Sequence, residues 1–168
     1  MNEHRPEFAN VRLLIGEGNT QMRQGLRSAL SAIGFVNGSD TGDLMEIEAS
    51  LSSGGVDLLI CDTAIEDSRI NEMTRRVRHQ ELGSNPFPVM ITITDNPTPE
   101  SIQEIIDSGA DGLLAKPVST GKLVERVLML AKERKLFVVT SDYIGPTRRK
   151  EPRLGTEKIP EIEVPNPV

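Results

Sequence analysis

The sequence has few of the features that mark secreted, membrane or nucleic-acid-binding proteins. Its one cysteine, Cys61, cannot form a disulfide within the chain and suits a reducing compartment. The N-terminus lacks the apolar core of a signal peptide, and no apolar run approaches the roughly 18 residues of a membrane span. With 19 basic and 25 acidic residues, the net charge of −6 argues against broad nucleic-acid binding. We therefore expect a soluble, cytoplasmic protein that binds neither membranes nor nucleic acid.

The chain alternates between strand-like and helix-like patterns from residue 11 to about residue 134. Strand-like runs end before loops, and apolar residues at helical spacing follow each run. The five predicted strands cover residues 11–16, 35–40, 56–61, 89–94 and 112–115. This alternation predicts an α/β fold, a doubly wound five-stranded parallel sheet with five helices, of the flavodoxin-like type.

The 168 residues divide into one domain and two extensions. Residues 1–10 form a short N-terminal extension, and residues 11–134 form the α/β domain. Residues 135–168 form a C-terminal extension that we expect to be partly extended or disordered, because its part after residue 140 holds five of the 11 prolines. Its apolar residues 136–140 predict an edge strand that pairs with a second copy and makes a homodimer.

Three polar residues lie at or just past the ends of three predicted strands: Asp62, Thr94 and Lys116. The carboxyl ends of parallel strands open onto one crevice, so these side chains are expected to converge. The acid can accept a phosphoryl group, the amine can neutralise its charge, and the hydroxyl can sense it through a hydrogen bond. The sequence therefore predicts a phosphoryl-accepting site at this end of the sheet.

This trio and the motifs around it resemble the bacterial response-regulator receiver domain. Thr94 precedes Lys116 by 22 residues, and Lys116 is followed by Pro117, as in that family. The resemblance implies that Asp62 is the phospho-acceptor, that Lys116 pairs with it and with its phosphate, and that Thr94 is the switch hydroxyl. Thr92 is an alternative to Thr94, and only the spacing to Lys116 decides between them.

The resemblance fails in part at the metal site. Receivers usually hold Mg²⁺ with two adjacent acids after the first strand, but here Glu17 is followed by Gly18. The resemblance thus implies a weak Mg²⁺ site made of Glu17, Asp62 and the backbone carbonyl of Ala64, since Mg²⁺ readily keeps waters in place of missing ligands. Other departures are Asp95 beside the predicted switch hydroxyl, and Leu113 in place of the aromatic residue that often moves with it.

Three functions are consistent with these patterns. The first is a single-domain response regulator that receives a phosphoryl group on Asp62 from a sensor histidine kinase or phosphotransfer protein and signals to an unknown output protein by contact. Such a protein is no enzyme beyond its own phosphorylation and dephosphorylation. The second is a degenerate receiver that acts as a phosphorylation-independent adaptor. The third is a haloacid-dehalogenase-like phosphatase, which needs a general acid where this chain has Ala64.

Overall fold

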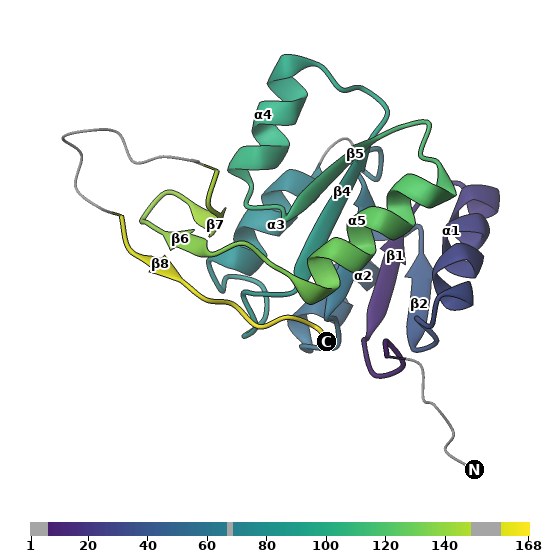
Figure 1. Cartoon of the computed structure of the whole chain (residues 1–168). Helices are drawn as coiled ribbons and strands as arrows, with labels where there is room; N and C mark the ends of the chain where they lie inside the picture. Colours follow the sequence, from purple (N-terminus) through teal and green to yellow (C-terminus); the bar gives the residue numbers. More distant parts are fainter. Residues whose placement is uncertain (1–6, 67–68, 149–158) are drawn as a thin grey trace, which may run out of the picture.

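The computed structural model describes residues 7–66, 69–148 and 159–168, and contains a five-stranded parallel sheet of order β2-β1-β3-β4-β5 (Figure 1). The strands are β1 (Leu13–Gly16), β2 (Gly38–Thr41), β3 (Leu58–Asp62), β4 (Val89–Thr94) and β5 (Gly112–Ala115). The helices are α1 (Thr20–Ala32), α2 (Leu44–Ser52), α3 (Arg69–Arg78), α4 (Pro99–Asp107) and α5 (Thr120–Lys132). The predicted fold is confirmed.

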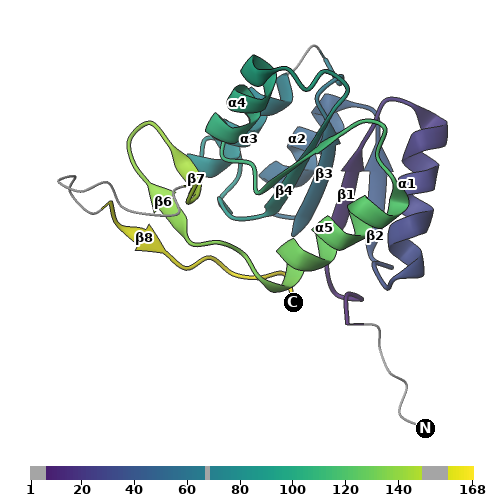
Figure 2. The same cartoon turned by 45° about the horizontal axis from the view of Figure 1, so that its top comes forward.

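Helices cover both faces of the sheet, so the central strands are buried on both sides. One face packs against α1 and α5, where Leu30, Leu123 and Val127 are buried. The other face packs against α2 and α3, where Ile47 and Met73 are buried. Helix α4 lies beside α3 in both views (Figure 2). In the described part of the chain, none of the helices has the length and apolar character needed to cross a membrane.

Polar side chains cap the N-terminal ends of two helices. The side chain of Asn19 accepts a hydrogen bond of 2.9 Å from the backbone N–H of Met22 at the start of α1. The hydroxyl of Thr98 accepts one of 3.2 Å from Ser101 at the start of α4. These side chains pair backbone donors that have no partner within the helix, and so fix where each helix begins.

The second strand begins later than predicted, at Gly38 instead of residue 35. The backbone N–H of Phe35 bonds to the carbonyl of Leu30 and still belongs to the end of α1. The Phe35 ring is fully buried and stacks on Phe8, with ring centroids 4.5 Å apart. The apolar character of Phe35 therefore reflects core packing and not membership of a strand.

The C-terminal extension forms a second, antiparallel sheet of order β7-β6-β8. Its strands are β6 (Phe137–Val139), β7 (Ile144–Pro146) and β8 (Glu161–Ile162). The sequence did not predict β7 or β8. The prediction that residues 136–140 pair as an edge strand with a second copy is wrong, because β6 is the middle strand and both of its edges are paired within the chain.

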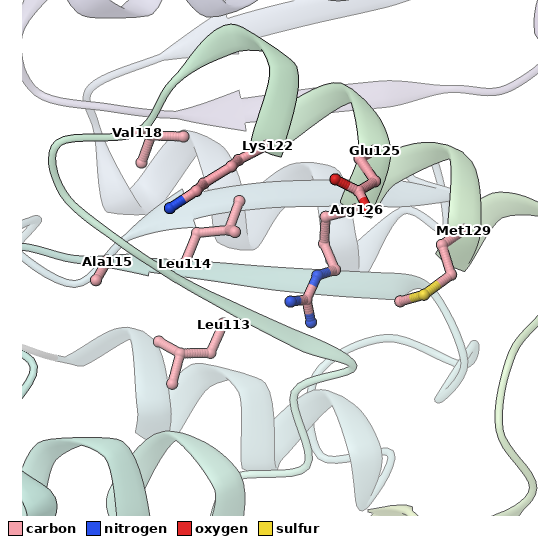
Figure 3. Close-up of a pocket in the computed structure, with 8 residues that line it drawn as sticks. All are labelled: Leu113, Leu114, Ala115, Val118, Lys122, Glu125, Arg126 and Met129. Atoms are coloured by element: carbon pink, nitrogen blue, oxygen red, sulfur yellow. The ribbon is translucent and has the colours of Figure 1, made fainter.

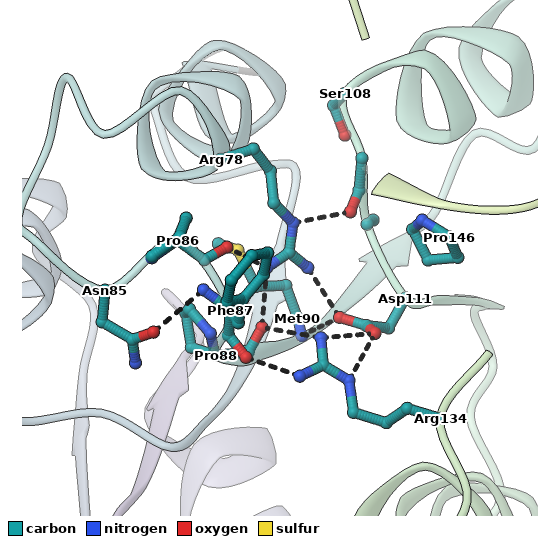
Figure 4. A network of polar contacts seen from close by, with 12 residues as sticks. Arg78, Asn85, Pro86, Phe87, Pro88, Met90, Ser108, Asp111, Arg134 and Pro146 are labelled. Carbon is teal, nitrogen blue, oxygen red and sulfur yellow. Dashed lines mark hydrogen bonds and ion pairs between the residues drawn. The ribbon is translucent and has the colours of Figure 1, made fainter. Parts of the chain in front are cut away.

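A buried ion cluster of Arg78, Asp111 and Arg134 joins this extension to the core of the α/β domain (Figure 4). The carboxylate of Asp111 contacts the guanidinium of Arg78 at 2.6 Å and that of Arg134 at 2.9 Å, and all three side chains are almost fully buried. It also accepts a hydrogen bond of 2.9 Å from the backbone N–H of Met90. Both guanidinium groups lie about 5 Å from the ring centroid of Phe137, at 5.0 and 4.8 Å, within the range of cation–π attraction. The start of β6 is thus held by the core.

Candidate functional site

The three predicted site residues come from the carboxyl ends of three adjacent strands. Asp62 is the last residue of β3, Thr94 is the last residue of β4, and Lys116 directly follows β5. The backbone N–H of Lys116 donates a hydrogen bond of 2.8 Å to the carbonyl of Thr94, which continues the pairing of β4 with β5 past the strand end. Sheet pairing alone therefore brings the three residues to one edge.

Lys116 bridges two buried carboxylates at this edge. Its ammonium forms ion pairs with Oδ2 of Asp62 and, at 3.2 Å, with Oε2 of Glu17. Asp62 is 1% exposed and Glu17 is 3% exposed, whereas the Lys116 side chain keeps 21% of its surface in contact with solvent. Because one cation faces two anions, the cluster carries a net negative charge that a further cation would balance.

Backbone N–H groups hold the other oxygen of each carboxylate. Oδ1 of Asp62 accepts a hydrogen bond of 2.8 Å from Ala64, and Oε1 of Glu17 accepts one of 2.9 Å from Asn19. The remaining oxygens, Oδ2 of Asp62 and Oε2 of Glu17, are buried and make no hydrogen bond of regular geometry. Both oxygens contact the ammonium of Lys116, and each carboxylate oxygen has a further lone pair for another ligand.

The charges in the cluster shift the pKa values of two of its members. Burial raises the pKa of Glu17, the bond from the Asn19 N–H lowers it, and the nearby Asp62 raises it, so that the net shift is upward. Burial alone would lower the pKa of Lys116, but its contacts with Asp62 and Glu17 outweigh this effect and raise it. Lys116 therefore stays protonated at neutral pH and can meet an incoming anion as a cation.

Arg23 is a site residue that the sequence did not single out for this role. Its guanidinium donates a hydrogen bond of 2.8 Å to the backbone carbonyl of Glu17 and pairs with Asp40 of β2 at 2.9 Å. Arg23 thereby ties the loop after β1 to the neighbouring strand. The only signal in the sequence is its position in the first turn of α1, four residues after the cap Asn19, where a side chain reaches back over the loop.

The donor set suits a divalent cation in part. Glu17 and Asp62 offer two buried carboxylate oxygens that face the same ammonium, and carboxylates are preferred ligands of Mg²⁺. Gly18 offers no side chain, and a Cβ added there would meet no atom within 4 Å. Among residues 7–66, 69–148 and 159–168, no three side chains of His, Cys, Asp or Glu form a group that could hold a metal.

The surroundings of Thr94 differ from those of Thr92. Thr92 lies inside the sheet, paired with Cys61 on β3 and Leu113 on β5. Thr94 ends β4 at the edge of the sheet where Lys116 meets the two carboxylates. The Thr94 hydroxyl accepts a hydrogen bond of 3.2 Å from the N–H of Asn96. Asp95 is exposed, so its carboxylate does not face the crevice as a buried repulsive charge.

Comparison with known proteins shows the family of the chain. The family described as response regulator receiver domain matches residues 13–128. The chain is 32% identical over 117 residues to the swarming motility regulation protein RssB of Serratia marcescens, which covers 70% of this chain and 51% of RssB. It is 24% identical over 132 residues to the sensory/regulatory protein RpfC of Xanthomonas campestris, covering 76% of this chain and 18% of RpfC. The chain thus spans about half of the first relative and less than a fifth of the second.

Solved receiver structures share the fold. The signal receiver domain of NarL from Mycobacterium tuberculosis superposes with a TM-score of 0.64 at 25% identity, over 74% of this chain and 98% of that chain. The chemotaxis protein CheY4 of Vibrio cholerae superposes with a TM-score of 0.62 at 24% identity, over 71% of this chain and 98% of that chain. Fold, strand-end trio and family match agree, and the chain belongs to the response regulator receiver family of two-component signal transduction.

Proposed function

We propose that this receiver accepts a phosphoryl group on Asp62 from a sensor histidine kinase or a phosphotransfer protein. The observation that carries this proposal is the buried contact between Oδ2 of Asp62 and the ammonium of Lys116, at the carboxyl edge of the sheet. A carboxylate held without a full set of hydrogen bonds is available as a nucleophile, and an adjacent cation stabilises the negative charge of the group it receives.

The transfer forms one bond and breaks one. A carboxylate oxygen of Asp62 attacks the phosphorus of a phosphohistidine, the P–N bond breaks, and the leaving imidazole keeps the electron pair and takes up a proton. The product on this chain is an acyl phosphate. Lys116 contacts Oδ2 of Asp62, so its ammonium is placed to pair with the phosphoryl oxygens that the reaction adds to this residue.

Receiver domains typically bind Mg²⁺ at this position, and this chain supplies part of such a site. Glu17, Asp62 and the backbone carbonyl of Ala64 would hold the ion, and Gly18 leaves one carboxylate missing. When bound, Mg²⁺ neutralises charge on the phosphoryl oxygens. Because Lys116 already pairs with both carboxylates, the ion would have to share them with the ammonium, and we expect weak binding.

Substituting Gly18 by aspartate is expected to tighten Mg²⁺ binding by about tenfold, since it adds a carboxylate at a position with free space. The matched control is Gly18→Asn, which has nearly the same shape but no charge. Isothermal titration with MgCl₂ compares the two with the native protein. An equal change in both variants would show that the missing charge does not limit the site.

Incubation with acetyl phosphate and Mg²⁺, followed by Phos-tag electrophoresis, tests the phosphorylation directly. We expect a slowly migrating band in the native protein and none in Asp62→Asn, whose amide is nearly the same shape as the carboxylate. A partner histidine kinase replaces acetyl phosphate in a second arm. Absence of the band with both donors would rule out the proposed reaction and favour the phosphorylation-independent adaptor.

The message would leave the domain by protein contact, on the face formed by β5 and α5. A hollow of about 460 Å³ opens there (Figure 3). Leu114 and Val118 are apolar residues of its lining beside α5, Leu113 lines it from the other side of β5, and the charged side chains of Lys122 and Arg126 on α5 flank it. Such a surface combines an apolar centre with a polar rim, which is the usual composition of a transient protein interface. The output protein is expected to bind here.

The two other candidate functions differ in their support. Gly18 and Leu113 favour the adaptor, since they remove a metal ligand and the aromatic residue that often moves with the switch. Nothing comparable favours the phosphatase: Ala64, with no acidic side chain, stands where that enzyme needs its general acid, and the family that matches the chain is a signalling module.

A further inference from the structure

The C-terminal extension packs directly against the segment that joins α4 to β5. Gly109 has a φ of +94°, and a Cβ added to it would lie 2.2 Å from the backbone oxygen of Ile144. A Cβ added to Gly145 would lie 2.7 Å from the Cα of Gly109. The backbones of β7 and the α4–β5 connection are thus in contact, with no side chain between them. Arg148 adds a hydrogen bond to the carbonyl of Ala110.

The same connection is held from the core side. Arg78 donates a hydrogen bond of 2.9 Å to the carbonyl of Gly109, and its guanidinium pairs with Asp111. Arg134 pairs with the other oxygen of Asp111 and, through Nη1, donates a hydrogen bond of 3.0 Å to the carbonyl of Pro165 in the last described segment. Segments both before and after the undescribed residues 149–158 therefore converge on the end of α4.

Helix α4 buries little of its surface. Ile105 is its only fully buried residue, as Leu30 is in α1, whereas α3 buries five and α5 buries four. Ile102 and Ile106 of α4 are partly buried. Gly109, which follows its C-terminal end, contacts both the extension and Arg78 of α3.

The N-terminal end of α4 is connected to the phosphoryl site. The Thr94 hydroxyl accepts a hydrogen bond from the N–H of Asn96, and the Asn96 carbonyl in turn accepts one from the Ser101 hydroxyl in the first turn of the helix. If Thr94 turned its hydroxyl toward a phosphoryl oxygen, the Asn96 N–H would lose its partner, and the loop that leads into α4 would be free to shift together with the capped start of the helix. Helix α4 joins this loop to the connection that contacts the extension, so a shift at one end of the helix can reach the other.

We propose that docking of the C-terminal extension is linked through α4 to occupancy of the Asp62 site, so that a phosphoryl group loosens the extension and a loosened extension favours the phosphoryl group. This inference rests on the proposed function of that site. Thermodynamic linkage requires that the free energy by which the phosphoryl group weakens docking equals the free energy by which docking weakens binding of the phosphoryl group.

Tyr143 reports on the extension without any label. It is the only tyrosine of a chain that has no tryptophan, and it lies half-buried beside β7, where its hydroxyl donates a hydrogen bond of 2.8 Å to the carbonyl of Pro146. Quenching of its fluorescence by acrylamide measures how far solvent reaches it. The full chain is titrated with Mg²⁺ and beryllofluoride, a stable mimic of the phosphoryl group, and ¹⁹F NMR of the bound fluoride independently measures occupancy.

We expect quenching of Tyr143 to increase as the site fills in the native protein, and to stay constant in Asp62→Asn. The variant Gly145→Ala places a methyl group against Tyr143 and Gly109, and is expected to bind beryllofluoride about fivefold more tightly because its extension is already loosened. Its matched control is Gly25→Ala, an exposed position of α1 where the added methyl group meets no atom within 4 Å and should leave the affinity unchanged.

The outcomes separate the linkage from the phosphoryl site. Bound fluoride with constant Tyr143 quenching in the native protein would overturn the linkage and leave the proposed function standing. This arm needs no variant, so it decides the question even if Gly145→Ala does not fold. Bound fluoride with equal affinities for Gly145→Ala and Gly25→Ala would also overturn it. No bound fluoride at millimolar concentration would overturn the proposed function, and the linkage with it.

Discussion

Replacing Asp111 by alanine is expected to lower the free energy of unfolding by about 3–5 kcal/mol, the usual effect of removing one partner from a buried ion pair. Asp111 is the only acid in contact with Arg78 and Arg134 among the interactions of the described residues, and both guanidinium groups are almost fully buried. The substitution leaves two cations facing each other out of water. Burial already lowers the pKa of Arg78, and Asp111 is the main charge that opposes this effect.

Urea denaturation followed by circular dichroism measures this loss. The control is Asp142→Ala, which removes an exposed acid from the same C-terminal extension and should change the free energy of unfolding by less than about 0.5 kcal/mol. A second variant, Asp111→Asn, keeps the shape and an acceptor oxygen while removing the charge, and should lie between the two. If Asp111→Ala lowered the free energy of unfolding by less than about 1 kcal/mol, hydrogen bonds to backbone carbonyls would be enough to stabilise the two buried guanidinium groups.

Replacing Lys116 by methionine is expected to destabilise the metal-free protein by about 2–4 kcal/mol, because Glu17 and Asp62 are then left as two buried carboxylates without their shared cation. Mg²⁺ should reverse much of this loss, since a divalent ion on the same two oxygens takes over the role of the ammonium. Ligands that bind only the folded state stabilise it in proportion to their affinity. The variant should therefore respond to Mg²⁺ more strongly than the native protein does.

Thermal unfolding with and without 10 mM MgCl₂, about the concentration at which a weak site fills, tests this expectation. Lys135→Met, at an exposed position beyond α5, serves as the matched control and should show the native response. If Lys116→Met were destabilised but insensitive to Mg²⁺, the two carboxylates would not form a cation site. If Lys116→Met were as stable as the native protein, the contacts of Lys116 with Glu17 and Asp62 would not contribute to stability.

The periodic part of the fold could be predicted from the sequence because its causes are local. Alternation of apolar strands with amphipathic helices specifies a parallel sheet with helices on both of its faces. The start of β2 was placed too early, since a buried aromatic residue such as Phe35 fits a strand and a core-packed loop equally well by composition.

The C-terminal sheet was missed because its stability comes from distant residues. Proline density indicated a tail without its own core, and β7 does contain Pro146, which sits opposite Phe137 at the edge of the sheet. What orders the segment is the docking of Phe137 on Arg78 and Arg134. No local pattern shows that an arginine in α3 and one after α5 meet at the same aspartate.

The positions of the three strand-end residues could be predicted from the sequence, but the contacts between side chains in the site could not. Spacing placed Asp62, Thr94 and Lys116 at one edge, because strand ends determine where those residues lie. The bridging of Lys116 to Glu17 depends on side-chain directions that spacing does not contain.

The central claim is that Asp62, Thr94 and Lys116 act together as one phosphoryl-binding site. Amide NMR of the full chain during titration with beryllofluoride in the presence of Mg²⁺ tests it most directly. The account predicts saturable shifts of the signals of Asp62, Thr94 and Lys116, which disappear when Mg²⁺ is omitted and in the Asp62→Asn variant. A folded protein whose three signals stay unchanged at millimolar beryllofluoride would contradict it.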